Sequence, residues 1–211
     1  MKFYDCSTAP SPRRARIALA EKGLLDDIEV IEINLRNKEQ ITPEFTTINP
    51  YRTVPVLELD DGRRITSSTG IFHYLEAARP DPPLIGRSPA EKGLVTDLEW
   101  RVELEGFSPI GECLRNTAKG MIGRALTGKY DYEQIPELGA RGRLRCERFL
   151  QDFDDLVGER RFLAGDNFTI ADITALVAID FAKWIKIELP KDATNAQRWY
   201  TEVSSRPSAD C

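Results

Sequence analysis

The strongest constraint on the fold is the stretch Asn49–Ser68, which predicts a loop, a strand opened by a proline, a tight turn, a second strand and a helix start. Val56, Leu57 and Leu59 are apolar residues typical of strands, and the Asp-Gly pair that follows them is a strong hairpin signal. Pro55 has no amide hydrogen, so it belongs at the first residue of a strand or on an edge. We therefore predict a β-hairpin with Pro55 at its entrance.

A cis bond between Val54 and Pro55 would give this hairpin a binding role. X–Pro bonds adopt the cis form at low cost, and a fixed cis proline usually has a purpose. In that form the N–H and C=O of Val54 would point outward, unpaired, and bind the main chain of an extended peptide. The alternative is an ordinary trans proline at the end of a strand.

Composition excludes several classes of protein. The chain has 211 residues, enough for one large or two small domains, with 41% hydrophobic and 30% charged residues. The net charge is −5, and the charges are interleaved, which predicts no nucleic-acid-binding or membrane-binding face. We expect neither a membrane span nor a signal peptide. The four cysteines lie far apart without C-x-x-C spacing, which argues against a metal or disulfide framework and favours a reduced, cytoplasmic setting.

The first eighty residues predict a small α/β domain. A strand begins at Lys2, and Ser11 followed by Pro12 is typical of a helix start, with Ser11 as the N-cap. Gly23 ends that helix, and residues 28–33 alternate as a half-buried strand does. The hairpin and a further helix follow, so we predict a mixed four-stranded sheet with helices over residues 1–80.

A proline-rich linker at 81–88 separates this domain from residues 89–211, where strand signals stop. Val95, Leu98 and Val102 share one helical face, and we expect the acidic and basic residues of the same helix, Glu99 among them, to form a solvated face. A second apolar stripe runs from Cys146 to Val157, and residues 119–137 predict a long loop. The second domain is therefore predicted to be all helical.

The centre of the helical domain is predicted from Phe168–Ile173. Thr169 stands as an N-cap and Asp172 three residues later, an acidic version of the capping box. The residues that follow, as far as Trp184 and Ile185, are apolar nearly all round, which is typical of a buried helix. We interpret this segment as structural and not catalytic.

The order of these segments resembles the cytosolic glutathione transferases. The resemblance covers essentially the whole chain and depends on three stretches: Val54-Pro55-Val56-Leu57, Ser67-Ser68-Thr69-Gly70-Ile71 and Phe168–Ile173. It implies a thioredoxin-like N-terminal domain, an all-helical C-terminal domain, a homodimer and glutathione as co-substrate, without a metal. The chain is most similar to the branch that has no dedicated catalytic tyrosine, serine or cysteine.

The resemblance also implies which residues bind glutathione. Val54, preceded by Thr53 and followed by Pro55, would pair its backbone with the cysteine of glutathione. Ser68, with Ser67, would take the γ-glutamyl carboxylate at a helix N-terminus, where an anion is stabilised. Family members often carry His and Lys where this chain has Gln40 and Ile41, which leaves Lys38, Arg36 or Arg52 to hold the glycine carboxylate beside Gln40. Arg52 stands where a glycine is usual.

The catalytic position of the family is the largest departure. Several classes place Ser or Cys where this chain has Ala9, and alanine cannot donate a hydrogen bond to a thiolate. Tyr4, the alternative to it, fits a strand residue. We therefore hypothesise that the start of the first helix, with the Ser11 hydroxyl and the Arg13 amide, stabilises the thiolate directly or through water; the simpler interpretation is that Ser11 only caps its helix. Cys6 suggests redox chemistry, although its place fits a buried cysteine at the end of a strand.

The resemblance thus implies a cytoplasmic detoxification enzyme that conjugates glutathione to small hydrophobic electrophiles. The electrophile would lie between the domains, and Arg115, Asn116, Thr117, Tyr130 and Trp184 are candidates to line that site or to be plain surface or core. Two rivals remain: a binding or scaffold protein that has lost the chemistry, as the missing anchors at Ala9, Gln40, Ile41 and Ser67 would allow, and a glutathione-dependent reductase or isomerase.

Overall fold

The computed structural model describes all 211 residues, which form two compact units. The first comprises Met1–Pro82 together with Thr127–Asp131 and Cys211. The second comprises Pro83–Leu126 and Tyr132–Asp210. The domain limits at 1–80 and 89–211 stay a prediction.

The first unit is built on a four-stranded sheet with the order β2-β1-β3-β4. Its strands are β1 (Lys2–Asp5), β2 (Glu29–Glu32), β3 (Val56–Glu58) and β4 (Arg64–Ile65). β1 pairs with β2 in parallel and with β3 antiparallel, and β3 pairs antiparallel with β4. The mixed sheet and the hairpin are therefore confirmed. Gly62 turns the hairpin with a φ of 82°, a backbone conformation that favours glycine.

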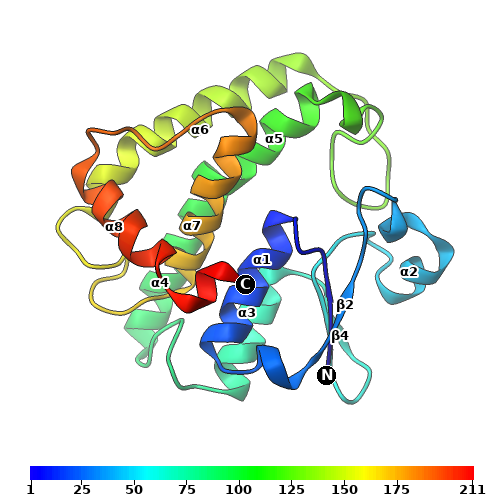
Figure 1. The fold of residues 1–211 in the computed structure, drawn as a ribbon, viewed down its shortest axis with the longest axis horizontal. Coiled ribbons are helices and arrows are strands. Elements are labelled where there is room, and N and C mark those ends of the chain that lie inside the picture. The colour runs from blue at the N-terminus through cyan, green and yellow to red at the C-terminus, as the bar shows by residue number, and fades with distance from the viewer. The chain divides into compact units, whose positions relative to one another are not determined.

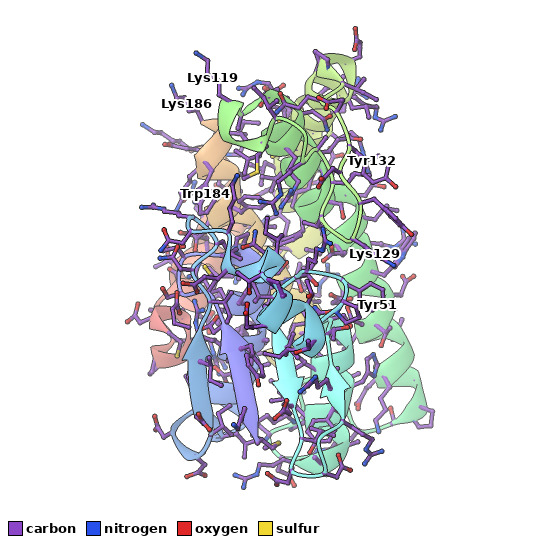
Figure 2. All side chains as sticks on the ribbon, turned by 90° about the vertical axis from the view of Figure 1, so that its right-hand side faces the viewer. Tyr51, Lys119, Lys129, Tyr132, Trp184 and Lys186 are labelled. Carbon is purple, nitrogen blue, oxygen red and sulfur yellow. The ribbon has the colours of Figure 1, made fainter.

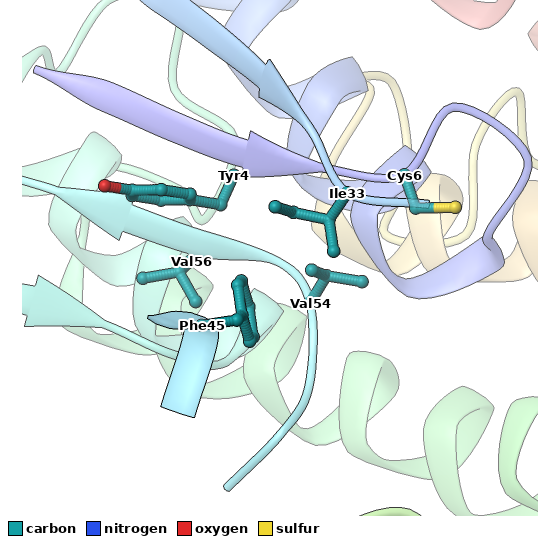
Figure 3. Packing of buried hydrophobic residues seen from close by; sticks show 6 residues of the cluster. All are labelled: Tyr4, Cys6, Ile33, Phe45, Val54 and Val56. Atoms are coloured by element: carbon teal, nitrogen blue, oxygen red, sulfur yellow. The ribbon is translucent and has the colours of Figure 1, made fainter. Parts of the chain in front are cut away.

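Three helices cover the sheet: α1 (Pro10–Glu21), α2 (Pro43–Ile48) and α3 (Ser68–Ala78). α1 and α3 lie side by side, and α2 lies on the other side of the sheet (Figure 1). Side chains alternate along a strand, so Tyr4 and Val56 share one face of the sheet, where they join a buried cluster with Phe45 of α2 (Figure 3). Phe3 and Leu57 occupy the opposite face and are fully buried. Tyr4 is thus a buried strand residue, as predicted.

A buried ion pair, which no local pattern of residues predicts, joins the end of α1 to α3. The Lys22 ammonium donates to a Glu76 carboxylate oxygen at 2.6 Å and to the Pro82 carbonyl at 2.5 Å. Both side chains are shielded from water, so the charge is compensated by direct hydrogen bonds. Gly23, with a φ of 62°, ends the helix as expected.

The second unit is all helical, as predicted, and none of its helices has the length and apolar character needed to cross a bilayer. Its helices are α4 (Pro89–Arg101), α5 (Ser108–Thr117), α6 (Pro136–Val157), α7 (Ile170–Ala182) and α8 (Thr194–Ser204), with a π-helical turn at Val102–Phe107. α5 and α6 approach closely at Gly142, where an added Cβ would lie 2.6 Å from the Pro109 carbonyl oxygen. The stripe from Cys146 to Val157 faces the interior, so this face of α6 was predicted correctly.

α7 is the buried centre of the second unit. Its first residue follows Thr169, the predicted N-cap, and the amide of Thr169 donates to Asp172 Oδ2 at 2.9 Å. Asp172 also accepts hydrogen bonds from the Leu163 amide at 2.8 Å and from the Trp199 indole at 2.9 Å. The carboxylate therefore joins α7, α8 and the loop before α7, which extends the predicted capping box into a tertiary anchor.

Two sequence predictions in this unit were wrong. Glu99 is buried, not solvated, because it lies on the face of α4 that packs on α7, where the Thr174 hydroxyl donates to its carboxylate at 3.3 Å. Trp184 is 55% exposed, because α7 ends at Ala182 and the chain continues as a short 3-10 turn. Its ring packs edge-on against Phe181 with the centroids 5.3 Å apart.

Candidate functional site

The main chain at Val54 is the first part of the candidate site. The Val54–Pro55 bond is cis, and β3 begins one residue later. Neither the N–H nor the C=O of Val54 has a hydrogen-bond partner in the structure. Its side chain is buried in the cluster with Cys6 and Phe45 (Figure 3), which fixes the orientation of the backbone. Main-chain groups near the interior are nearly always paired, so this edge is available to an extended ligand.

Asn49 holds the loop that leads to Val54, and we did not predict this role. Its side chain is completely buried; the amide nitrogen donates to the Thr53 carbonyl at 2.7 Å and to the Thr53 hydroxyl at 3.0 Å. Its amide oxygen accepts from the Tyr51 N–H at 3.0 Å. The Asn-Pro pair at this position was the available signal, because asparagine side chains commonly bond to the backbone two residues later. Thr53 therefore positions the loop through Asn49.

The start of α1 differs from the prediction. Ala9 is the N-cap, Pro10 is the first helical residue, and no side chain caps the helix. Ser11 is the second residue of the helix, so the prediction that it serves as N-cap was wrong. Both Pro10 and Pro12 suit the first turn of a helix, and Arg16 of the same helix pairs with Asp5.

The uncapped start leaves one free amide. Pro10 and Pro12 have no N–H, and the Arg13 N–H donates to the Ala9 carbonyl at 3.3 Å. The Ser11 N–H has no partner, and the adjacent Ser11 hydroxyl lies at the same positive helix end. The Arg13 amide, a candidate from the sequence, is therefore engaged, whereas Ser11 offers both an amide and a hydroxyl.

Two carboxylates, those of Asp5 and Glu32, hold the loop between β1 and α1. The Arg16 guanidinium donates to Asp5 Oδ1 at 2.6 Å and to the Ser7 carbonyl at 3.0 Å. Burial raises the pKa of the Asp5 carboxyl, while the hydrogen bonds from Arg16 act in the opposite direction. On the other side of the loop, the Ser7 amide and hydroxyl both donate to Glu32 Oε1 at 3.0 Å. This loop therefore fixes the start of α1.

The start of α3 is the second helix terminus of the site. Ser67 is its N-cap and accepts from the Gly70 N–H at 3.1 Å. The buried Ser68 donates its hydroxyl hydrogen to the Ser11 carbonyl at 3.0 Å, which joins the starts of α1 and α3. The amides of Ser68 and Thr69 have no partner in the protein. The structure thus brings Ser11, Ser67 and Ser68 together at two converging positive helix ends.

The other sequence candidates lie on the segment before the hairpin. Lys38 and Arg52 have left-handed backbones, with φ of 60° and 57°, and their side chains make no ion pair or hydrogen bond. Gln40 is buried, and its side-chain oxygen has no hydrogen-bond partner. Lys38 and Arg52 thus supply cations and Gln40 an unpaired acceptor, although no contact ties them directly to Val54 or Ser11.

The cysteines form no disulfide bond. All four are free thiols, and Cys6 is buried at the end of β1, as expected. Burial raises the pKa of Cys146 to about 12 and also raises that of Cys113, so both thiols stay protonated near neutral pH. No group of three or more His, Cys, Asp or Glu side chains is arranged to hold a metal ion.

Both family models that match this chain describe glutathione S-transferases. Residues 8–78 match the glutathione S-transferase N-terminal domain, and residues 142–207 match the C-terminal domain. The chain is 37% identical to glutathione S-transferase 2 of Saccharomyces cerevisiae over 208 residues, which covers 99% of this chain and 87% of that protein.

Two crystal structures show the same fold. Gtt2 from Saccharomyces cerevisiae superposes with a TM-score of 0.90 at 37% identity, over 100% of this chain and 99% of that one. A glutathione S-transferase domain-containing protein from Marinobacter aquaeolei does so with a TM-score of 0.90 at 34% identity, over 99% of each chain. Neither rival function is favoured by these similarities. The chain belongs to the glutathione S-transferase family, and it is a glutathione transferase with a thioredoxin-like N-terminal domain.

Proposed function

We propose that this glutathione transferase conjugates the glutathione thiolate to small hydrophobic electrophiles, and that it activates the thiol at the start of α1 without a dedicated catalytic side chain at Ala9. The observation that carries the proposal is a set of unpaired groups. The Ser11 amide and hydroxyl and the Ser68 amide lie at two helix starts that a hydrogen bond joins, and Ala9, before the first of them, packs against the buried cluster that holds Val54 with its unpaired main chain. An acidic tripeptide has a partner for each of them.

Each part of glutathione is assigned to one of these groups. The cysteine backbone pairs with the N–H and C=O of Val54 as an added strand would. The γ-glutamyl carboxylate binds at the start of α3, at Ser67 and Ser68. The glycine carboxylate lies toward Lys38, Gln40 and Arg52, where two free cations replace the His and Lys of other members. Thr53 and Pro55 set the geometry of the Val54 edge.

The free energy needed for thiol activation is modest. A free thiol has a pKa near 8.5, so lowering it by one to two units requires roughly 1.4 to 2.7 kcal/mol. A helix N-terminus contributes about 0.3 to 1 kcal/mol at an exposed site and up to about 2 kcal/mol when partly buried. One hydrogen bond from the Ser11 hydroxyl adds about 1 kcal/mol. The start of α1 can therefore supply the shift, with Ser11 rather than the Arg13 amide as the donor.

The decisive experiment is a titration of enzyme-bound glutathione, followed by the ultraviolet absorbance of the thiolate. Ser11→Ala should raise the pKa of the bound thiol by about 0.4 to 1 unit, because one hydrogen bond to the anion is lost. Ser11→Thr keeps the hydroxyl and is the matched control, expected to titrate as the wild type does. An unchanged titration in Ser11→Ala would remove the Ser11 hydroxyl from the mechanism.

Binding itself is tested by isothermal titration calorimetry with glutathione. We expect retention at millimolar ligand and a loss of affinity of about tenfold for each carboxylate anchor removed, as in Lys38→Met or Arg52→Met. Absence of any heat at millimolar glutathione would contradict the assignment of this site.

We further propose that the enzyme works as a cytoplasmic homodimer. Family members commonly dimerise, and α4 exposes Leu94 and Trp100, with Arg101 and Glu103 near its end. An isologous Arg–Glu pair would suit a two-fold interface. Sedimentation equilibrium should give twice the chain mass, and a monomer at micromolar concentration would contradict this proposal.

A further inference from the structure

The side chain of Arg64 joins the β3–β4 hairpin to the end of α2. Its Nε donates to Glu58 Oε2 at 2.7 Å, and its Nη1 donates to the Thr47 carbonyl at 2.8 Å and more weakly to the Ile48 carbonyl at 3.4 Å. Glu58 lies directly opposite Arg64 in the hairpin, and both carbonyls belong to the last turn of α2. One guanidinium therefore fixes the end of this helix to the sheet.

The charges suit this arrangement. The last carbonyls of a helix have no partner within it and carry a partial negative charge, which a cation stabilises. Glu58 pairs with the same cation, and the hydrogen bond from Arg64 lowers the pKa of its carboxyl, so Glu58 stays ionised near neutral pH. The planar, forked guanidinium holds a carboxylate and a carbonyl in one fixed geometry, which a lysine ammonium cannot do as well.

The helix α2 has few other anchors. It is six residues long, and so short a helix is marginal by itself, so its position depends on contacts with the rest of the unit. Phe45 is its one buried side chain and packs edge-on against Tyr4, with the ring centroids 6.3 Å apart. Phe45 lies in the first half of the helix, so Arg64 is the side chain from the sheet that holds its other end.

The end of α2 determines where the Val54 main chain lies. Asn49 comes directly after the helix, and its buried side chain donates to the carbonyl and the hydroxyl of Thr53, the residue before Val54. Tyr51, between them, is 62% exposed and lies at the surface of the molecule (Figure 2), so it does not anchor the loop by packing. If the end of α2 moved, Asn49 and the bonds that position Thr53 would move with it.

We propose that Arg64 is a positioning residue for glutathione binding: it holds the end of α2 and, through Asn49, keeps the Val54 main chain where the tripeptide pairs with it. The inference rests on the proposed function, because it names what fixes the edge that glutathione binds. Loss of Arg64 lowers the fraction of molecules that are ready to bind and leaves the chemistry of the bound complex unchanged. The apparent dissociation constant rises in inverse proportion to that fraction.

Calorimetry with glutathione on a pair of variants measures this effect. Arg64→Met removes both sets of hydrogen bonds, and we expect the dissociation constant to rise roughly tenfold, as it would if about one molecule in ten kept the loop in place. Arg63→Met is the matched control, because its neighbouring arginine pairs only with Asp61 at the hairpin turn and 78% of its side chain is exposed. A rise in Arg64→Met no larger than that in Arg63→Met overturns the proposal.

Glu58→Gln separates positioning from a direct effect of charge. This variant keeps the Arg64 cation but weakens the hydrogen bond that orients it, so glutathione binding should weaken by about two- to threefold. If Arg64 acted only as a cation that attracts the anionic tripeptide, removal of the negative charge of Glu58 would strengthen binding instead. Tighter binding in Glu58→Gln therefore overturns the positioning role.

Steady-state kinetics distinguish positioning from a loss of folded enzyme. With chlorodinitrobenzene as the electrophile, Arg64→Met should raise KM for glutathione by roughly tenfold and leave kcat at saturating glutathione unchanged, because every bound molecule has the loop in place. The pKa of the bound thiol should also stay at its wild-type value, since the start of α1 is untouched. A fall in kcat with an unchanged KM would show a purely structural role and overturn the proposal.

Hydrogen exchange of the free protein separates this proposal from the proposed function, because it needs no glutathione. The Arg52 amide donates to the Asn49 carbonyl at 3.0 Å and the Tyr51 amide to Asn49 Oδ1 at 3.0 Å, so both amides report on the loop. Arg64→Met should speed their exchange by roughly tenfold and leave the amides of β1 unchanged, because the opening is local.

Faster exchange confined to the loop in Arg64→Met, and absent in Arg63→Met, supports the positioning role even if the wild type does not bind glutathione. Equal exchange in the two variants overturns it even if the wild type binds glutathione and conjugates it. Exchange that is faster in β1 as well would show a general loss of stability and would also overturn it.

Discussion

The starts of α1 and α7 have the same polarity, but the start of α7 is capped by a side chain of the protein and the start of α1 is not. At α7, Asp172 accepts hydrogen bonds from the Thr169 amide and hydroxyl, from Leu163 and from Trp199. Every one of these partners belongs to the protein, and Asp172 is completely buried. At α1, Ala9 provides no side-chain cap, and the Ser11 amide is left without a partner.

The difference shows two uses of the positive end of a helix: at α7 it binds a carboxylate of the protein, and at α1 it is left without a cap. Each terminus presents unpaired amides and roughly half a positive charge. Asp172 satisfies that end of α7 and links it to α8, so its contribution is to stability. The end of α1 is left without a cap, so its contribution is available to a ligand. The capped start of α7 is therefore structural, and the uncapped start of α1, beside other unpaired groups, marks a site.

The largest effect is expected from removing the Asp172 carboxylate at the start of α7. Asp172→Asn should lower the free energy of unfolding by about 3 to 5 kcal/mol, because its amide group cannot accept from all the donors that the carboxylate satisfies. Urea denaturation measures this loss. Asp166→Asn, in an exposed part of the preceding loop, is the control and should change stability by less than about 0.5 kcal/mol. Equal stabilities of the two variants would show that the Asp172 network is not the anchor of the second unit.

The next largest effect is expected from adding a side-chain cap to the start of α1. Ala9→Asp would place a carboxylate at the N-cap of α1, where the only free amide of the first turn is that of Ser11, since Pro12 has none. We expect folding stability to rise by about 0.5 to 1 kcal/mol. The pKa of bound glutathione should rise by about one unit, because a negative charge now competes with the thiolate.

Ala9→Asn separates the two consequences of this cap. Asparagine caps a helix as well as aspartate does, without the charge, so the gain in stability should persist while the thiol pKa rises by less. Thiolate absorbance and thermal unfolding measure both quantities on the same samples. If Ala9→Asp left the bound thiol unchanged, the start of α1 would not be the element that activates it.

Local signals in the sequence predicted most of the fold. The Asp61-Gly62 turn, the Pro55 strand entrance and the spacing of Thr169 and Asp172 each act over a few residues, and all three gave the correct element. The start of α1 was misplaced because both Ser11-Pro12 and Ala9-Pro10 satisfy the local rule. Nothing within these two dipeptides decides between them.

The parts that the sequence did not predict depend on distant partners. Glu99 is buried against Thr174, which lies 75 residues later in the chain, and Lys22 pairs with Glu76 across 54 residues. Asn49 acts only four residues away, but its signal, Asn followed by Pro, is common to ordinary turns.

The start of α3 is intermediate between those of α1 and α7, because only some of its amides are paired. Ser67 satisfies one amide, that of Gly70, and leaves those of Ser68 and Thr69 unpaired. Ser67→Ala should lower stability by about 1 kcal/mol through loss of the cap. It should also weaken glutathione binding by several-fold if the γ-glutamyl carboxylate lies there, as calorimetry can measure. A loss of stability without any change in affinity would place Ser67 with Asp172 among the purely structural caps.

The smallest effect is expected from relieving the left-handed backbone at Arg52. Arg52 holds a φ of 57°, and Lys186, just after α7, holds a φ of 59°. This left-handed conformation is unfavourable for residues with a Cβ, so Arg52→Gly and Lys186→Gly should each stabilise the fold by about 0.5 to 1 kcal/mol. Only Arg52→Gly should also weaken glutathione binding, because it removes a cation next to the Val54 edge, whereas Lys186 lies in the other unit. Denaturation and calorimetry on both variants therefore test whether Arg52 is kept in a strained conformation because its charge binds glutathione. If the two variants were equally stabilised and bound glutathione with the same affinity, arginine at position 52 would have no role in binding.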